Sequence, residues 1–166
     1  MVQQVIDTGM HRPFKQPFRR YPLAQLEIID EHVSEMLLND VLETAAYPWA
    51  SNVVLVSKAN GQLRFCVDNR RLNLQTYKVS YPLAMIETCL DSLERLKFYS
   101  SLDLRSGYWQ AKIDPESADQ TAFVTRRGTF KFKVLSFGLT NAPALFQRLM
   151  DLVLAGLTWE VFLVSR

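Results

Sequence analysis

The dipeptide Asn60-Gly61 lies between two short apolar runs, and it constrains the fold of this chain more than any other local feature. Asn-Gly suits a two-residue turn whose twist matches that of the antiparallel strands it joins. The run before it is Val53-Val54-Leu55-Val56, and the run after it is Leu63-Arg64-Phe65-Cys66-Val67. The pattern therefore predicts a β-hairpin.

Other elements are predicted around this hairpin, and together they indicate a mixed α+β fold. A second hairpin is predicted for residues 121–135 around Arg126-Arg127-Gly128. Apolar side chains recur with a helical period in residues 23–42, which predicts an amphipathic helix, and a second helix is predicted over residues 83–96. The remaining predictions are a strand at 99–104, a helical turn from Asp114-Pro115, and a last helix capped by Asn141 with Pro143 in its first turn, ending near Gly156.

The chain is predicted to form one domain preceded by an arm. Residues 1–22 contain Pro13, Pro17 and Pro22 among basic and aromatic residues, which favours extended backbone. Residues 23–166 are about the length of one typical domain, and the chain is 48% hydrophobic, enough to bury a core. We therefore expect an extended arm over 1–22 and a single domain over 23–166.

Charge and cysteine content limit the possible surroundings of the protein. The net charge is only +2, so a basic groove for nucleic acid would depend on how the basic residues are distributed. Cys66 and Cys89 lie in apolar runs without metal-ligand spacing, which indicates buried free thiols in a reducing compartment. With no signal pattern and no apolar run of about 20 residues, the chain is predicted to be soluble and intracellular, in the cytoplasm or nucleus, with no membrane association.

The segment Leu102-Asp103-Leu104-Arg105-Ser106-Gly107-Tyr108-Trp109-Gln110 carries one carboxylate at a predicted strand end, followed by a bend that Gly107 would permit. A carboxylate there can hold a divalent metal such as Mg²⁺, whose other positions keep phosphate oxygens and water. The alternative is an ordinary turn or helix-capping Asp. On this segment alone the structural role is favoured.

Six segments in order resemble the reverse transcriptase of gypsy-type long-terminal-repeat retrotransposons and, more distantly, of retroviruses. They are Tyr47-Pro48-Trp49-Ala50-Ser51 with the Val53–Val56 run, residues 63–73, Tyr81-Pro82-Leu83, residues 101–110, Thr121-Ala122-Phe123, and residues 137–150. The resemblance implies the fingers and part of the palm of a right-hand-shaped polymerase, with a mixed or antiparallel sheet and packed helices. It implies an RNA-directed DNA polymerase that binds an RNA or DNA template-primer and deoxynucleoside triphosphates.

The resemblance also assigns roles near the first catalytic carboxylate. Asp103 matches the catalytic Asp that bridges two Mg²⁺ ions, and the carbonyl of Leu104 would be a further metal ligand and line the nucleotide site. Tyr108 matches the ring that excludes the 2′-OH of a ribonucleotide. The alternative for Tyr108 is a core tyrosine at a bend.

Further residues match nucleotide and template contacts of the family. Lys58 and Arg64 would grip the triphosphate, unless they only make the hairpin edge soluble. Phe137 and Gly138 would form the floor of the nucleotide site, or simply pack ahead of the last helix. Arg70, Arg71 and Asn73 match residues that make template contacts or contacts within the fold.

The sequence departs from the family pattern at its carboxyl end. Ser165 stands where the family has the Tyr of a Tyr-x-Asp-Asp turn, and both aspartates are absent. We therefore expect a C-terminally truncated polymerase fragment that is inactive alone, because one carboxylate leaves two metal ions short of ligands. The alternative is a non-catalytic nucleic-acid-binding or partner-binding module on the same scaffold, and the oligomeric state is left open.

Overall fold

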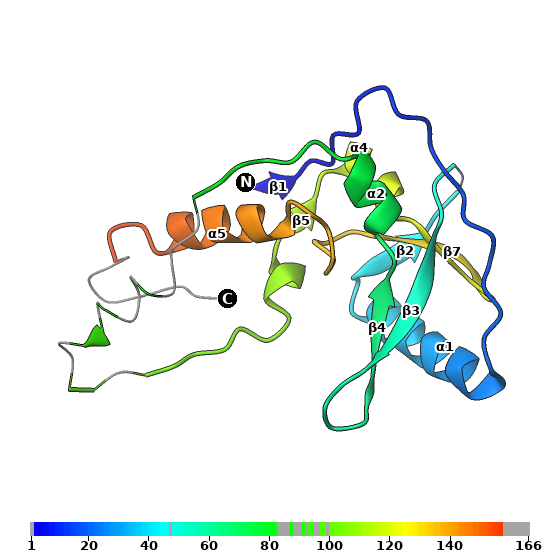
Figure 1. The fold of residues 1–166 in the computed structure, drawn as a ribbon, viewed down its shortest axis with the longest axis horizontal. Helices are drawn as coiled ribbons and strands as arrows, with labels where there is room; N and C mark the ends of the chain where they lie inside the picture. Colours follow the sequence, from blue (N-terminus) through cyan, green and yellow to red (C-terminus); the bar gives the residue numbers. More distant parts are fainter. Residues whose placement is uncertain are drawn as a thin grey trace.

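The structure of the chain is a computed structural model that describes residues 2–46, 48–82, 87, 91, 93–94, 97–98 and 100–157 (Figure 1). These residues form a mixed α+β fold, as the sequence predicts. One five-stranded sheet and one two-stranded sheet are present in the described part. Helix α5 and the segment that precedes Tyr108 lie to one side of the larger sheet (Figure 1).

The larger sheet contains both predicted hairpins. Its strand order is β2 (Leu42–Thr44), β7 (Gly128–Phe132), β6 (Phe123–Thr125), β3 (Ser51–Ser57) and β4 (Leu63–Val67). The β3–β4 and β6–β7 pairs are antiparallel, whereas β3 and β6 are parallel. Gly61 in the first turn has φ +80°, the conformation for which glycine is favoured there. Both hairpin predictions are confirmed.

The core lies where aromatic side chains of this sheet meet helix α1 (Leu23–Leu38). Phe123 is fully buried, and its ring is 5.5 Å from the rings of both Phe65 and Phe132. From α1, Ile29 and Val33 are buried against this cluster. The apolar period that predicts α1 therefore marks its buried face.

Helix α1 ends at Leu38, four residues before the predicted end at residue 42. Asp40 adopts φ 56°, and the amide of Val41 donates to the carbonyl of Met36 at 2.9 Å. Asp tolerates the left-handed conformation better than most residues. The chain then turns into β2, where Leu42 pairs with Phe132, so pairing in the sheet overrides the helical period.

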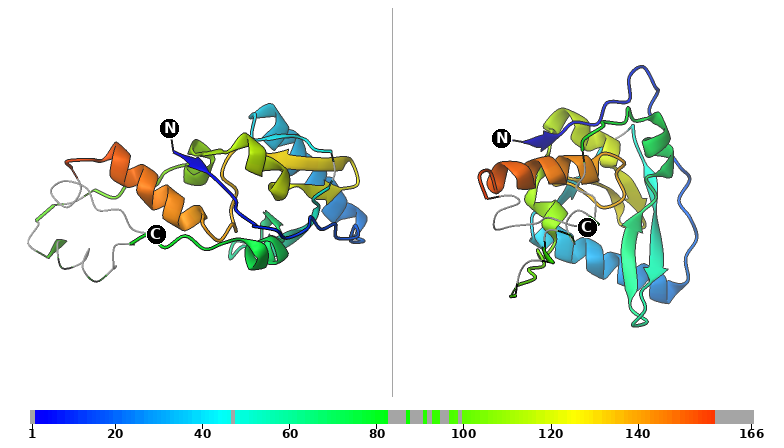
Figure 2. Two further views of the ribbon diagram at one scale, coloured as in Figure 1. Left: turned by 90° about the horizontal axis from the view of Figure 1, so that it is seen from above. Right: turned by 60° about the vertical axis from the view of Figure 1, so that its left-hand side comes forward.

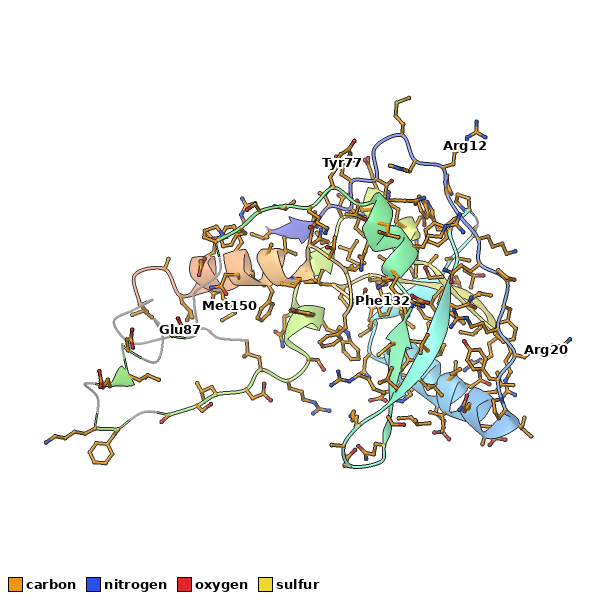
Figure 3. The ribbon with its side chains drawn as sticks, viewed as in Figure 1. Arg12, Arg20, Tyr77, Glu87, Phe132 and Met150 are labelled. Carbon is orange, nitrogen blue, oxygen red and sulfur yellow. The ribbon has the colours of Figure 1, made fainter. Side chains whose placement is uncertain are left out.

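The arm over residues 2–22 runs along the outer edge of the sheet to α1 (Figure 1). It begins with β1 (Gln3–Gln4), which pairs in parallel with β5 (Lys112–Ile113) and contacts α5. Further along, Asn52 fastens it, because its Nδ2 donates to the Gln16 Oε1 at 3.2 Å and to the Pro17 carbonyl at 3.0 Å. Figure 3 shows Arg12 and Arg20 pointing outward from the arm.

The helices after β4 are short except for the last. They are α2 (Arg70–Gln75), the 3₁₀ turn η1 (Gly107–Gln110), α4 (Pro115–Ala118), the 3₁₀ turn η2 (Asp119–Thr121) and α5 (Ala142–Val153). The predicted turn after Asp114 and the predicted last helix are confirmed as α4 and α5. Asn141 stands at the N-cap position of α5 but makes no capping bond. Its side chain bonds the backbone of Tyr77 and Val79 instead.

The predicted strand over 99–104 is wrong for residues 100–104, which are not in a strand. Leu102 is 80% exposed, so the apolar residues that suggested a buried strand face solvent. A strand needs a hydrogen-bonding neighbour, and the described residues provide none here. The described residues do not include residue 99, most of the predicted helix over 83–96, or residues 158–166.

Cys66 on β4 is a free thiol, but it is half-buried rather than fully buried as the sequence suggested. Burial raises the pKa of the Cys66 thiol. Cys89 lies outside the described residues. Among the helices that the structure describes, none combines the length and apolar character needed to cross a membrane.

Candidate active site

The turn η1 lies close to α5 (Figure 2), and the ring of its Tyr108 contacts the ring of Phe146 on that helix. The residue in the left-handed conformation is Ser106, with φ 50°, and not the glycine that the sequence suggested for the bend. Gly107 meets a different need: a Cβ atom there would lie 3.1 Å from the Cζ of Phe146 on α5. The glycine therefore allows η1 to approach the helix closely.

The Tyr108 ring lies between two other aromatic rings. Its centroid is 4.9 Å from that of Phe137 and 5.3 Å from that of Phe146. The second contact is edge-on at 66°, a geometry that aromatic pairs favour. Tyr108 is half-buried, so part of a ring in a fixed orientation remains accessible.

The loop that carries Phe137 is held from α2. The Asn73 Nδ2 donates to the carbonyl of Gly138 at 2.7 Å, and its Oδ1 accepts from the amide of Thr140 at 2.9 Å. The Nδ2 of Asn69 donates to the carbonyl of Phe137 at 3.3 Å. Gly138 has φ +84°, a conformation that other residues rarely adopt. Two predicted site residues, Phe137 and Asn73, thus meet at one loop.

Asp103 and Leu104 lie on the exposed segment that leads into η1. A carboxylate and a backbone carbonyl are the oxygen ligands that Mg²⁺ prefers. In the part of the chain that the structure describes, no group of three or more His, Cys, Asp or Glu side chains is placed to hold a metal. The described residues therefore fit a contribution to a magnesium site, not a complete one.

Lys58 and Arg64 lie on the first hairpin, and both side chains are exposed. Arg64 on β4 pairs with Val56 on β3. Lys58 directly follows β3, and its amide donates to the carbonyl of Gln62 at 2.7 Å, which closes the turn. The hairpin backbone is thus hydrogen-bonded up to its turn, while the two cationic side chains are exposed.

Arg70 and Arg71 begin α2 and are oriented by different partners. Arg70 donates from two nitrogens to the Asp68 carboxylate, each at 2.7 Å, and Arg19 of the arm lies 3.5 Å from the same group. The Asp68 side chain is 5% exposed and that of Arg70 is 81% exposed. The guanidinium of Arg71 lies 4.5 Å from the centre of the Phe14 ring. A basic surface therefore forms where the arm meets α2.

A family model described as "Reverse transcriptase (RNA-dependent DNA polymerase)" matches residues 56–164. This match spans more than half of the chain and includes Lys58, Asp103, Tyr108 and Phe137. The chain belongs to the reverse transcriptase family. The six ordered segments thus predicted the reverse transcriptase family correctly, and the assignment to the gypsy type stays a prediction.

Relatives of this reverse transcriptase domain include transposon polyproteins. The chain is 34% identical over 144 residues to the retrovirus-related Pol polyprotein from transposon 412 of Drosophila melanogaster, covering 83% of the chain and 12% of the polyprotein. It is 46% identical over 92 residues to an RNA-directed DNA polymerase homolog of Oenothera berteroana, covering 55% of the chain and 65% of that protein. The chain thus spans a small part of the transposon polyproteins it matches.

Solved structures share the fold of this reverse transcriptase domain. The prototype foamy virus protease-reverse transcriptase is 26% identical, with a TM-score of 0.83, over 94% of this chain and 21% of the viral one. The foamy viral protease-reverse transcriptase in complex with dsDNA superposes with a TM-score of 0.87 at 24% identity, over 99% of this chain and 34% of the other. The α+β arrangement is therefore that of a viral reverse transcriptase.

Three residues of the reverse transcriptase domain that shape this site were missed by the sequence analysis: Asn69, Phe146 and Asp68. Asn69 and Asn73 are four residues apart, so they share a face once α2 forms. That spacing was a usable signal, but no helix was predicted at residues 70–75. The burial of Asp68 and the approach of Phe146 depend on tertiary contacts, which no local pattern encodes.

The Asp68–Arg70 pair gives a prediction on stability against pH. Hydrogen bonds from Arg70 hold the pKa of the Asp68 carboxyl below its usual value. A lowered folded-state pKa stabilises the fold above the unfolded value of about 3.9, and this contribution disappears as the pH falls through the folded value. Asp68→Asn should therefore lower the free energy of unfolding by about 1 kcal/mol near neutral pH, a modest loss because Arg70 is in solvent.

Urea unfolding of both proteins at about pH 7 and about pH 2 tests this prediction. The difference between wild type and Asp68→Asn should shrink at the acidic pH. A difference that is equal at both pH values would show that the ionised Asp68 carboxylate does not stabilise the fold.

Proposed function

We propose that this domain belongs to a gypsy-type retrotransposon polymerase and adds deoxynucleotides to a primer paired with an RNA or DNA template. The observation that carries the proposal is the contact of the Tyr108 ring with Phe137, on a loop held by Asn73. All three positions lie inside the reverse transcriptase match. The proposal places the fingers and part of the palm in residues 23–166, the arm in 1–22, and the protein inside the cell.

In this proposal the nucleotide lies between the hairpin and η1. Lys58 and Arg64 bind the triphosphate as a point charge and a planar fork. Phe137 and Gly138 support the nucleotide, and Tyr108 lies beneath its sugar. Arg70 and Arg71 contact template phosphates from the start of α2, with sequence-independent affinity that falls as salt rises.

Asp103 and the carbonyl of Leu104 would hold magnesium in this proposal. Two bound Mg²⁺ ions would activate the primer 3′-hydroxyl and neutralise charge on the triphosphate. Among the 166 residues there is no Tyr-x-Asp-Asp sequence to supply the other carboxylates. We therefore propose that this 166-residue chain alone does not extend a primer.

Primer extension tests the proposed function. The completed polymerase, defined here as this chain followed by a family-type Tyr-x-Asp-Asp hairpin and thumb, should extend a DNA primer on RNA with Mg²⁺. The 166-residue chain should not. Extension by the short chain that is lost in Asp103→Asn would refute the need for further carboxylates, and failure of every folded, primer-binding completed form would refute the polymerase proposal.

Tyr108→Ala in the completed polymerase should weaken discrimination against ribonucleotides. The methyl group leaves room for a 2′-OH that the phenol ring would strike. Steric overlap typically costs about 1–3 kcal/mol, which corresponds to about a 5- to 150-fold loss of discrimination. The ratio of kcat/KM for a deoxyribonucleotide to that for the ribonucleotide is the measurement.

Tyr108→Phe is the matched control, since it keeps the ring and removes only the hydroxyl. It should keep the wild-type ratio. If Tyr108→Ala also keeps it, Tyr108 is a packing residue for Phe137 and Phe146 and does not select the sugar.

A further inference from the structure

Helix α2 holds the loop before α5 by side-chain to backbone hydrogen bonds. Asn73 uses both ends of its amide, donating to the carbonyl of Gly138 and accepting from the amide of Thr140. Asn69, one turn earlier on the same face, donates to the carbonyl of Phe137. The carbonyls of Phe137 and Gly138 and the amide of Thr140 are thus all hydrogen-bonded to side chains at α2.

The segment after α2 adds a second attachment. The Asn141 Oδ1 accepts from the amide of Val79 at 3.0 Å, and its Nδ2 donates to the carbonyl of Tyr77 at 2.8 Å. Asn141 is itself buried, at 5% exposure. Residues 69–79 and residues 137–141 therefore form one hydrogen-bonded unit, although they are about 60 positions apart in the chain.

Within this unit, the side chain of Phe137 is largely exposed to solvent. It is 55% exposed, and its ring contact is with Tyr108 on η1. Its own packing is therefore too weak to fix the backbone at Phe137 and Gly138. The attachment to α2 does so instead, and a loop held in one conformation loses less entropy when it binds a ligand.

We propose that Asn73 is a positioning residue that sets the affinity of this domain for the incoming nucleotide, by holding Phe137 and Gly138 in register with Tyr108. The inference rests on the proposed function, because it concerns the same nucleotide site. The hydrogen bonds of Asn73 to the loop are contacts within the fold, one of the two alternatives that the resemblance left open, and the inference adds what these contacts do. Asn69 supports the same loop through one bond.

Steady-state kinetics of the completed polymerase give the first test. Asn73→Ala removes both hydrogen bonds to the loop and should raise KM for the deoxynucleotide about tenfold, with kcat changed less than about twofold. Asn73→Asp keeps an acceptor for the Thr140 amide but cannot donate to Gly138, so its KM should lie between those of wild type and Asn73→Ala. A purely structural role would instead lower the amount of active enzyme, and with it kcat, and leave KM unchanged.

Leu74→Ala is the matched control, since Leu74 lies beside Asn73 on α2 and is 87% exposed. It should leave both constants at their wild-type values. A KM for Asn73→Ala within about twofold of wild type, or an equal rise in Leu74→Ala, would overturn the inference.

Amide hydrogen exchange in the 166-residue chain gives a second test that needs no polymerase activity. The Thr140 amide should exchange at least about tenfold faster in Asn73→Ala than in wild type, while the Phe123 amide in the core sheet keeps its protection. If the completed polymerase is inactive, the proposed function fails, yet this measurement still decides whether Asn73 holds the loop. Equal exchange at Thr140 in the two proteins would overturn the inference.

Discussion

Asp103→Asn should abolish primer extension by the completed polymerase, with kcat reduced at least about 10³-fold, because a metal-bound carboxylate supplies several kcal/mol of charge stabilisation. The amide of Asn is neutral and is a weaker ligand for Mg²⁺. Asp103 is exposed, so the substitution removes little that stabilises the fold. The effect should therefore appear in catalysis and not in folding.

The measurement is single-nucleotide incorporation at saturating template-primer, together with the melting temperature of each protein. Glu116→Gln on α4 is the control, since it neutralises another exposed carboxylate outside the candidate site. It should keep wild-type kcat. If Asp103→Asn keeps its activity, or loses it only in parallel with its melting temperature, Asp103 is the turn or capping Asp of the alternative interpretation.

Local chemistry was enough to predict both hairpins. Asn60-Gly61 and Arg126-Arg127-Gly128 each lie between strands that are adjacent in the sequence, so the turn residues predict that these strands pair. They do not fix the register of the first hairpin, where Ser57 pairs with Leu63 across residues 58–62 and not across a two-residue turn. The parallel pair β3–β6 joins segments about 70 residues apart, and no local pattern specified it. The same limit applies at residues 100–104, where a short segment with two leucines has no partner strand and does not form a strand.

The candidate site was predictable only through the resemblance. Tyr108 and Phe137 lie 29 positions apart in the sequence, yet their rings are 4.9 Å apart in the structure. The resemblance assigned both residues to the nucleotide site. The structure shows the backbone features that bring them together, which are the left-handed conformation of Ser106 and the close approach of Gly107 to Phe146. The hydrogen bond from Asn73 to Gly138 was not predicted from the sequence, because it depends on α2, a helix that no apolar period indicated.

Phe123→Ala should strongly destabilise the domain, because the ring is the centre of the aromatic core. Phe123 is fully buried on β6 and contacts the rings of Phe65, Phe130 and Phe132. Truncating a buried Phe to Ala typically costs about 3–5 kcal/mol, through lost burial and the cavity left behind. Domains are stable by only about 5–15 kcal/mol, so a large part of the stability would be lost.

Urea unfolding of the wild type and Phe123→Ala measures the loss, and Phe98→Ala provides a matched control for the same chemical change. Phe98 is 92% exposed, so its truncation should change the free energy of unfolding by less than about 0.5 kcal/mol. Both substitutions remove a phenyl group, so the difference between their effects on the free energy of unfolding measures the contribution of burial. A decrease below about 1 kcal/mol in Phe123→Ala would mean that the strands close over the cavity, and that the four rings do not form a rigid core.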